Sequence, residues 1–163
     1  MLNTGLMSSD RPDWNTPPEF MERVYRVGPV ALDPCSNPTS IVKARTAWSL
    51  ENGDDGLAHS WIAYAGRELV YVNPPYGREI AAWMAHCFDN AGEVIALVPA
   101  RTDARWFASY CWAASRICFV RGRLKFLGAP SSAPFPSAVV YWGQRYAQRF
   151  AEVFGEIGKV VTP

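Results

Sequence analysis

The amino-acid sequence predicts an α/β fold with a mostly parallel sheet, antiparallel strands near the C-terminus and helices on both faces. Short apolar runs alternate along the chain with segments whose apolar residues recur at helical spacing, an order typical of α/β sheets. The run at 93–98 is almost continuously apolar, which indicates a central parallel strand. The length of 163 residues, 49% of them hydrophobic, suits one globular domain. We expect residues 1–13 to be a flexible leader and residues 14–163 a single domain.

The composition argues against several classes of protein. The four cysteines (Cys35, Cys87, Cys111 and Cys118) show no C-x-x-C spacing, and the two histidines (His59 and His86) lie far in sequence from any cysteine pair, so we expect free thiols and no metal site. No apolar run approaches the ~18 to 20 residues of a membrane span, and the first residues lack a signal-peptide pattern. We therefore expect a soluble protein of a reducing cytoplasm, with no membrane partner.

Charge is distributed unevenly along the chain. Residues 1–98 hold 7 Lys and Arg against 12 Asp and Glu, whereas residues 99–163 hold 9 against 3. A basic half is the usual footprint of a polyanionic partner such as nucleic acid. The alternative is a solvated helix face, and the imbalance alone favours neither interpretation.

The first helix is expected from about Pro17 to Val27. Thr16 can cap it, Pro17 suits the first helical position and Glu19 completes a capping box. Gly28 ends the helix.

A short buried strand over Val30–Leu32 follows and ends in Asp33-Pro34-Cys35-Ser36. A carboxylate directly after an early parallel strand lies where open α/β sheets bind ligands, and its partner there is expected to be positive. Residues 38–60 are loop-rich, with a short strand expected within 41–48.

The polar run Asn73-Pro74-Pro75-Tyr76-Gly77 follows the apolar run 69–72 and precedes a helix expected over 78–90. Its two prolines fix two φ angles and remove two backbone donors, so the backbone is rigid there. The Asn73 side chain and the Pro74 carbonyl present acceptors, and Tyr76 adds a flat ring. This set suits an exocyclic amine on a planar heterocycle. The alternative is a proline-rich turn with a buried tyrosine.

The basic half begins after the strand at 93–98. We expect a helix from about Asp103 to Ala114, a strand over 117–120, a loop over 128–137, a last strand over 137–142 and a closing helix over 144–154. The segment 121–126 carries three basic residues and a glycine, which suits phosphate contact. The alternative is an edge hairpin guarded by charge.

Five motifs in order resemble the phage-type, Dam-like family of DNA N6-adenine methyltransferases. They are Trp14-x-Thr16-Pro17, Leu32-Asp33-Pro34-Cys35-Ser36-Asn37, Asp55-Gly56-Leu57 with Trp61, Asn73-Pro74-Pro75-Tyr76, and Val98-Pro99-Ala100-Arg101-Thr102-Asp103-x-Arg105-Trp106-Phe107. The resemblance spans about Trp14 to Gly143. It implies a Rossmann-like fold that uses S-adenosylmethionine (SAM), and a phage- or prophage-encoded enzyme of the bacterial host cytoplasm, as in restriction-modification. One departure is the lack of a G-x-G loop, in whose place Asn37-Pro38-Thr39-Ser40 stands.

The resemblance implies direct methyl transfer from SAM to N6 of a flipped adenine in double-stranded DNA. The implied catalytic residues are Asn73, Pro74, Pro75 and Tyr76. The implied cofactor-binding residues are Trp14, Thr16, Pro17, Asp33, Pro34, Cys35, Ser36 and Asp55. Together with the basic segment, the candidate DNA-binding residues are Arg101, Thr102, Arg105, Arg121, Arg123 and Lys125. Asp33 would meet the methionyl ammonium of SAM and Asp55 its adenine amine, although Asp55 also suits a solvated turn.

Two other functions fit the same residues. Asn-Pro-Pro-Tyr is also similar to the motif of enzymes that methylate a glutamine side-chain amide, although the basic half favours DNA. A catalytically silent protein that binds DNA or SAM is the third interpretation, because residues 37–70 and the segment after Gly143 are too short for a separate target-recognition domain. The target sequence and the oligomeric state stay open.

Overall fold

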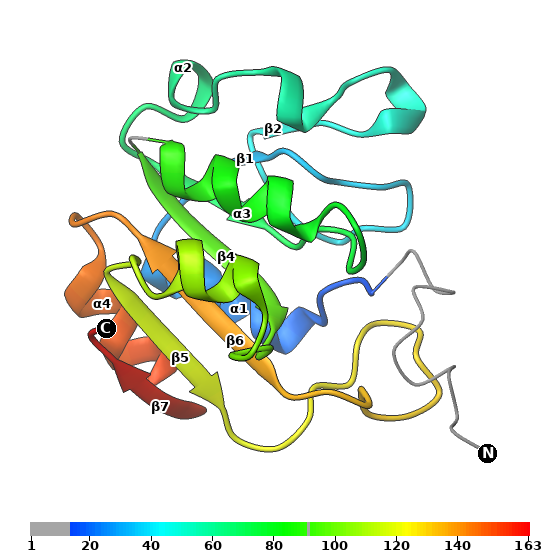
Figure 1. Ribbon diagram of the computed structural model, residues 1–163. Coiled ribbons are helices and arrows are strands. Elements are labelled where there is room, and N and C mark those ends of the chain that lie inside the picture. The colour runs from blue at the N-terminus through cyan, green and yellow to red at the C-terminus, as the bar shows by residue number, and fades with distance from the viewer. Residues whose placement is uncertain (1–13, 91) are drawn as a thin grey trace.

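The computed structural model describes residues 14–90 and 92–163, in which seven strands form one mixed sheet between helices (Figure 1). The predicted leader, residues 1–13, lies outside the described residues. The strands are β1 (Val30–Asp33), β2 (Thr46–Ala47), β3 (Leu69–Val72), β4 (Glu93–Pro99), β5 (Arg116–Val120), β6 (Ser137–Trp142) and β7 (Gly158–Val161). The helices are α1 (Pro18–Val27), α2 (Ile62–Ala65), α3 (Ile80–Asp89) and α4 (Ala147–Phe154), with short turns η2 (Leu50–Asn52), η3 (Gly56–Ala58) and η4 (Phe107–Cys111).

The strands lie in the order β2-β1-β3-β4-β6-β5-β7. The first three pairings are parallel, and the pairings β4–β6, β6–β5 and β5–β7 are antiparallel. This confirms the predicted α/β sheet with antiparallel strands near the C-terminus. Strands β1 to β5 all run in the same direction, so their carboxyl ends meet at one edge of the sheet. We call this edge, marked by Asp33, Val72, Pro99 and Val120, the carboxyl edge.

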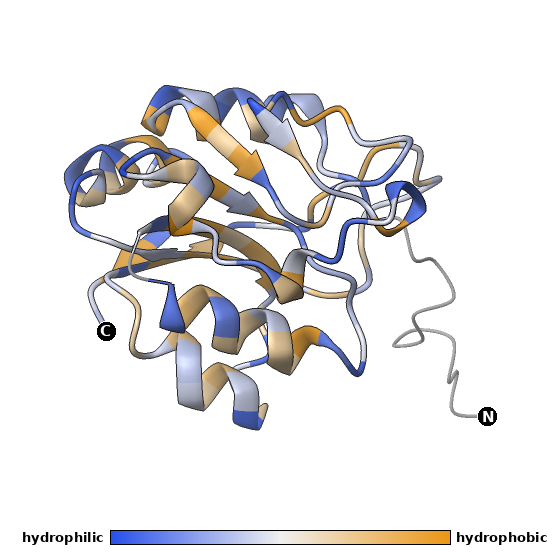
Figure 2. Cartoon of the chain, turned by 90° about the horizontal axis from the view of Figure 1, so that it is seen from above, coloured by the Kyte–Doolittle hydropathy of each residue, from blue (hydrophilic) through white to orange (hydrophobic). Residues whose placement is uncertain are grey.

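Helices cover both faces of the sheet, as predicted (Figure 1). Apolar residues of α1 and α4 pack on one face, and those of α3 and η4 pack on the other. Strands β1, β3 and β6 are consequently buried at every position, which explains why they are apolar apart from Asp33 and Ser137 rather than alternating. Figure 2 shows these hydrophobic strands between the more polar outer surfaces of the helices.

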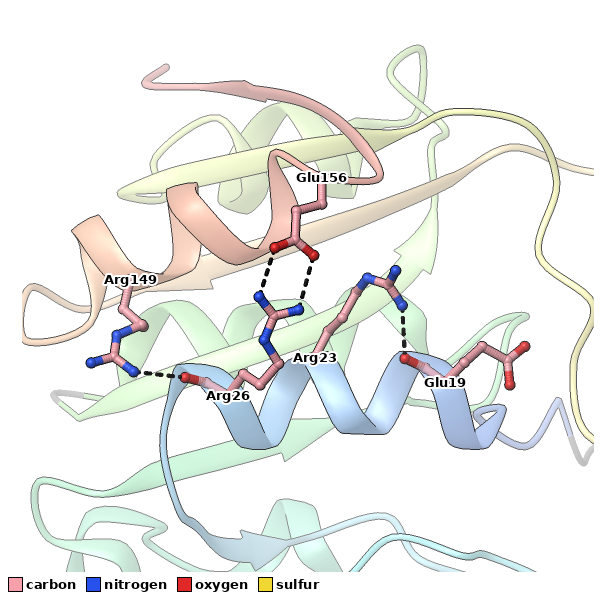
Figure 3. A network of polar contacts seen from close by, with 5 residues as sticks. All are labelled: Glu19, Arg23, Arg26, Arg149 and Glu156. Carbon is pink, nitrogen blue, oxygen red and sulfur yellow. Dashed lines mark hydrogen bonds and ion pairs between the residues drawn. The ribbon is translucent and has the colours of Figure 1, made fainter.

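Polar contacts also join α1 to α4 (Figure 3). Arg26 donates two hydrogen bonds to the Glu156 carboxylate, at 2.6 and 2.9 Å, and Arg149 donates to the Arg26 carbonyl at 3.2 Å. Arg26 and Glu156 are exposed, so this pair adds little stability beside the buried apolar contacts.

The predicted capping box of the first helix is wrong. Pro17 is the N-cap residue of α1 and no side chain caps the helix. Thr16 is buried, and its hydroxyl lies 2.7 Å from the Tyr71 hydroxyl on β3 instead of at the helix. The residue type is that of a cap, but a buried partner on the sheet takes its hydrogen bond.

The predicted helix from Asp103 to Ala114 is also wrong in type and length. A π-helical turn, η4, occupies Phe107–Cys111, and the Trp112 N–H donates to the Phe107 carbonyl at 3.2 Å. This wider turn buries both Phe107 and Cys111 against the face that α3 covers. The packing of these side chains therefore favours a π-helical turn here, although the spacing of apolar residues in the sequence is that of a regular α-helix.

Strand β7 and the short α2 were not predicted. Strand β7 pairs with β5, which places β5 inside the sheet between β6 and β7. The edge-hairpin interpretation of residues 121–126 is therefore wrong, because the strand before them has neighbours on both sides. The other expected elements are present with ends shifted by a few residues, and the strand expected within 41–48 is β2.

Candidate active site

A cavity of about 300 Å³ opens at the carboxyl edge, a volume at the lower end of small-molecule sites. Three segments far apart in the sequence line one side of it: Trp14–Thr16 before α1, Asp33–Asn37 after β1, and Asn73–Pro75 after β3. The loop from Trp48 to Leu57 contributes further lining, and the remaining lining residues are Ser40, Val42, Tyr71, Glu79 and Trp83. The predicted position, at the ends of the first parallel strands, is where the cavity lies.

Asp33 is a buried carboxylate in this cavity, with 3% of its surface exposed. Burial raises its pKa from 3.8 to about 7, and the Cys35 N–H, which donates to Oδ1 at 3.2 Å, opposes that shift only partly. Within residues 14–90 and 92–163, no Lys, Arg or His forms an ion pair with it. A buried carboxylate without a cation is costly, so this position is suited to a positively charged ligand.

The Asn73 amide is held in one orientation. Its Nδ2 donates to the Trp14 carbonyl at 2.6 Å and to the Thr16 hydroxyl at 3.1 Å. A carbonyl only accepts, so the NH₂ group must face Trp14 and Oδ1 must face the other way. Oδ1 accepts from the Tyr76 hydroxyl at 3.1 Å, which leaves it a second lone pair for another donor.

Tyr76 belongs to a cluster of four rings that we call the aromatic cluster: Trp14, Tyr76, Phe126 and Phe135. Tyr76 meets Phe126 and Phe135 edge-on, with centroids 6.3 and 5.5 Å away, and Trp14 meets the same two rings at 5.3 and 5.4 Å. The Leu97 carbonyl lies 3.3 Å from the Tyr76 hydroxyl and shares its single proton with Asn73 Oδ1. Burial raises the pKa of Tyr76 well above its usual value, so it is a neutral phenol.

Phe126 and Phe135 were not among the predicted site residues. Both lie in the connection between β5 and β6: Phe126 ends the basic segment for which phosphate contact was predicted, and Phe135 lies in the predicted loop over 128–137. The signal that could have identified them is a pair of large aromatic residues in an otherwise small and polar segment. Such residues must pack on something, and here they pack on the tyrosine of the Asn73–Gly77 run.

The segment before α1 joins the loops around the cavity. The Asn15 side chain donates to Thr39 Oγ1 at 2.7 Å and accepts from Asn37 Nδ2 at 2.7 Å. Its backbone carbonyl accepts from the Leu127 N–H at 2.9 Å. Through Asn15 and its neighbours, the loops that follow β1, β3 and β5 therefore share one anchor.

Most of the predicted cofactor-binding residues line the cavity. They are Trp14, Thr16, Asp33, Pro34, Cys35, Ser36 and Asp55. Pro17 lies outside the lining, at the N-cap of α1. Asp55 is exposed and accepts from the Leu57 N–H at 3.0 Å, which caps η3. Of the predicted catalytic residues, Asn73, Pro74 and Pro75 line the cavity, and Tyr76 lies beside it in the aromatic cluster.

The predicted DNA-binding residues lie outside the cavity lining but at the same edge of the sheet. Arg101, Thr102 and Arg105 follow β4, and Arg121, Arg123 and Lys125 follow β5. All are exposed except the half-buried Arg101, whose Nε lies 3.6 Å from an Asp103 carboxylate oxygen. The structure thus brings two basic segments to the edge that also holds Asn73.

The cysteines at and near the site are not suited to act as nucleophiles. Burial raises the pKa of Cys35 well above its usual value and that of Cys118 to about 12, so both are protonated thiols and poor nucleophiles. In the part of the chain that the structure describes, no group of three or more His, Cys, Asp or Glu is placed to hold a metal. None of the helices in that part combines the length and apolar character needed to cross a membrane.

Comparison with known proteins agrees with the geometry of the site. A family model described as DNA N-6-adenine-methyltransferase (Dam) matches residues 3–139, which include α1, the cavity lining, the Asn73–Gly77 run and both basic segments. No curated protein matches the chain. The family match covers most of the chain and confirms the resemblance seen in the five motifs. The chain belongs to the Dam family of DNA N-6-adenine methyltransferases.

Proposed function

We propose that this protein transfers a methyl group from SAM to the N6 amine of an adenine flipped out of double-stranded DNA. The observation that carries the proposal is the Asn73 amide, whose oxygen is turned by two hydrogen bonds on Nδ2 to accept from a donor beside the cavity. Asn73 lines the same cavity as Asp33, a buried carboxylate that forms no ion pair among the described residues.

The cavity residues fit SAM, which when bound supplies an electrophilic methyl group. Asp33 would hold the methionyl ammonium by a charge-assisted hydrogen bond, and this cation would offset the cost of burying the carboxylate. Asp55, at the mouth of the cavity, would accept from the adenine amine of the cofactor while keeping its bond to Leu57. Pro34, Cys35 and Ser36 would border the cofactor, and Trp14 and Thr16 would close over it.

Asn73 and Pro74 would receive the target amine. Asn73 Oδ1 and the Pro74 carbonyl each accept one amine hydrogen, and no donor among residues 14–90 and 92–163 is bonded to the Pro74 carbonyl. Bonds to both hydrogens withdraw the nitrogen lone pair from the ring, so that it can attack the methyl carbon. The N6–methyl bond would form as the sulfur–methyl bond of SAM breaks, S-adenosylhomocysteine would leave as a neutral thioether, and N6 would lose one proton to solvent. Tyr76 would hold the face of the base, with Pro75 keeping the turn rigid.

The basic segments would hold the DNA backbone. Arg101, Thr102 and Arg105 follow β4, which is next to β3, and Arg121, Arg123 and Lys125 follow β5 farther along the same side of the carboxyl edge. Side chains of this kind contact phosphates and fix the duplex without reading its sequence.

The direct experiment incubates the protein with unmethylated double-stranded DNA and labelled SAM, quantifies N6-methyladenine and maps its sequence context. In parallel, a protein extract takes the place of the DNA. We expect label in DNA. Label confined to protein would favour glutamine methylation, and no transfer despite intact SAM binding would favour a silent binding protein.

Two variants test the residues. Asn73→Ala and Tyr76→Ala should lower the methylation rate by about 100-fold or more, since each removes a group that contacts the reacting base. SAM binding, measured by calorimetry, should stay within about threefold of wild type because both groups act on the other substrate. Gln148→Ala, on the exposed face of α4, is the matched control and should keep full activity. Full activity in both site variants would overturn the assignment.

A further inference from the structure

Five carboxylates line the cavity: Asp33, Glu51, Asp54, Asp55 and Glu79. The lining contains no Lys or Arg among the residues that the structure describes, and none of the five carboxylates forms an ion pair there. The ion pairs in that part of the chain, such as Arg45–Glu68, lie elsewhere. The cavity is therefore strongly negative with no compensating charge of its own.

A second observation indicates that a ligand completes this cavity. Asp33 is 3% exposed and lines the cavity. It accepts from the Cys35 N–H at 3.2 Å, but no Lys, Arg or His among residues 14–90 and 92–163 forms an ion pair with it. A buried carboxylate without a cation is costly, so a positively charged ligand would stabilise it.

The five carboxylates differ in how deeply they lie in the cavity, and this difference suggests two ways of interacting with a ligand. Asp33 is buried at the end of β1, whereas Glu51 and Glu79 are exposed and Asp54 is half-buried, at the mouth. A ligand with an ammonium group would bond directly to Asp33. The carboxylates at the mouth would act on any further positive charge of the ligand through space, without needing a contact.

We propose that Glu51, Asp54 and Glu79 make the cavity bind SAM, the cationic methyl donor, in preference to S-adenosylhomocysteine, the product that remains after methyl transfer. This inference rests on the proposed use of SAM. The donor carries a positive sulfonium that S-adenosylhomocysteine lacks, while the ammonium, carboxylate and nucleoside are common to both. Asp33 therefore favours donor and product alike, and the three mouth carboxylates favour only the donor.

The test compares ligand affinities by calorimetry at low salt, using SAM, S-adenosylhomocysteine and sinefungin, whose amine supplies a positive charge in place of the sulfonium. The variant is Glu51→Gln/Asp54→Asn/Glu79→Gln. The matched control is Glu19→Gln/Glu22→Gln/Glu152→Gln, which changes the net charge equally at exposed positions on α1 and α4 outside the cavity lining.

We expect the affinity ratio of SAM to S-adenosylhomocysteine to fall by on the order of tenfold in the cavity variant, about two- to threefold for each carboxylate removed. Sinefungin should weaken with SAM, the product should bind within about twofold of wild type, and the control should keep the wild-type ratio. An unchanged ratio, or an equal loss for both ligands, would overturn the inference. If the wild-type protein methylates DNA but the cavity variant keeps the wild-type affinity ratio, only this inference fails. If the wild-type protein binds no SAM, the proposed function fails together with this inference.

Discussion

The side chain of Asn73 is oriented by residues nearly sixty positions away in the sequence. The Trp14 carbonyl and the Thr16 hydroxyl bind its NH₂ group, and Thr16 is itself held 2.7 Å from the Tyr71 hydroxyl. These three contacts fix which atom of the amide is presented as an acceptor. The segment before α1 thus positions a proposed catalytic oxygen as well as bordering the cavity.

Thr16 is therefore a positioning residue, and its hydroxyl can be tested separately from its shape. Thr16→Val keeps the volume but removes the acceptor for Asn73 and leaves the Tyr71 hydroxyl without its partner. We expect kcat to fall by about tenfold or more with little change in KM for DNA, and stability to fall by about 1 to 3 kcal/mol. Thr16→Ser should stay within about threefold of wild type, since it keeps the oxygen. Steady-state methylation rates of the two variants test this prediction. A wild-type kcat in Thr16→Val would contradict the role of Thr16 in positioning Asn73.

Asp33 predicts a dependence on pH. Its pKa in the folded protein is about 7 against 3.8 as the reference, so between these values the folded state holds a proton that the unfolded state releases. The stability of the ligand-free protein should therefore decrease as pH rises from about 4 to about 7, by roughly 4 kcal/mol, and then level off. Asp33→Asn should remove this decrease, which thermal unfolding across that range would measure.

SAM affinity should depend on pH in the opposite direction. The ammonium of the donor bonds to the ionised carboxylate, so affinity should rise by about tenfold from pH 6 to pH 8. The Asp33→Asn variant should bind weakly at both values and show no such rise. Calorimetric titration at the two pH values checks this, and an equal slope in wild type and variant would assign the pH effect to another group.

At the scale of elements, the turn η3 depends on a glycine for its close approach to the loop after β1. A Cβ at Gly56 would lie 1.9 Å from the Pro34 carbonyl oxygen and 3.0 Å from the Trp83 ring. The first of these atoms is backbone and the second belongs to a buried ring, so neither can move aside without displacing the cavity wall. Gly56 thus sets the spacing between two sides of the cavity.

Gly56→Ala should consequently destabilise the protein by about 1 to 3 kcal/mol and weaken SAM binding with it. Gly53→Ala is the matched control three residues earlier: Gly53 has a φ of 82° but no atom within 4 Å of an added Cβ. It should cost only the left-handed backbone penalty of about 1 to 2 kcal/mol and leave SAM binding unchanged. Thermal unfolding and calorimetry measure the two effects. Equal loss of SAM affinity in both variants would refute the spacing argument.

Sequence predicted those elements whose type depends on local pattern. The apolar runs that became β3, β4 and β6, and the apolar stripe of α3, were located because burial on the sheet or on one helix face dictates residue type directly. The π turn at Phe107–Cys111 and the uncapped start of α1 were missed, because packing partners far along the chain decide them. Strand β7 was missed because four residues, none fully buried, carry too weak a pattern.

The same distinction holds for the site. The Asn73–Tyr76 loop and Asp33 were predicted since each follows a strand directly and the topology brings strand ends together. Phe126 and Phe135 could not be predicted, because their contact with Tyr76 depends on how the β5–β6 connection folds back. Nor does any local pattern reveal that Asn15 joins the loops after β1 and β5.

At the scale of the whole molecule, the uneven charge of the sequence becomes a division of the carboxyl edge. The acidic cavity lies at the β1–β3 side, and the basic segments after β4 and β5 lie at the other. The Asn73–Gly77 run follows β3, between the two. The acidic cavity repels a polyanion such as DNA, and the basic segments attract it. The same acidic cavity attracts a cationic methyl donor, and the basic segments repel it. The two proposed substrates would thus approach Asn73 from opposite sides without competing for one surface.

This division predicts which charges set the salt dependence of DNA binding. The triple variant Arg121→Ala/Arg123→Ala/Lys125→Ala should reduce the slope of log affinity against log salt by about 2 to 3, since each lost phosphate contact removes about 0.9. Arg67→Ala/Arg145→Ala/Arg149→Ala is the matched control, because it removes three charges at exposed positions away from the carboxyl edge. It should change the slope by less than about 1. Fluorescence anisotropy with duplex DNA over a salt series measures both slopes. Equal slopes for the two variants would show that net charge alone, rather than the basic segment after β5, governs DNA binding.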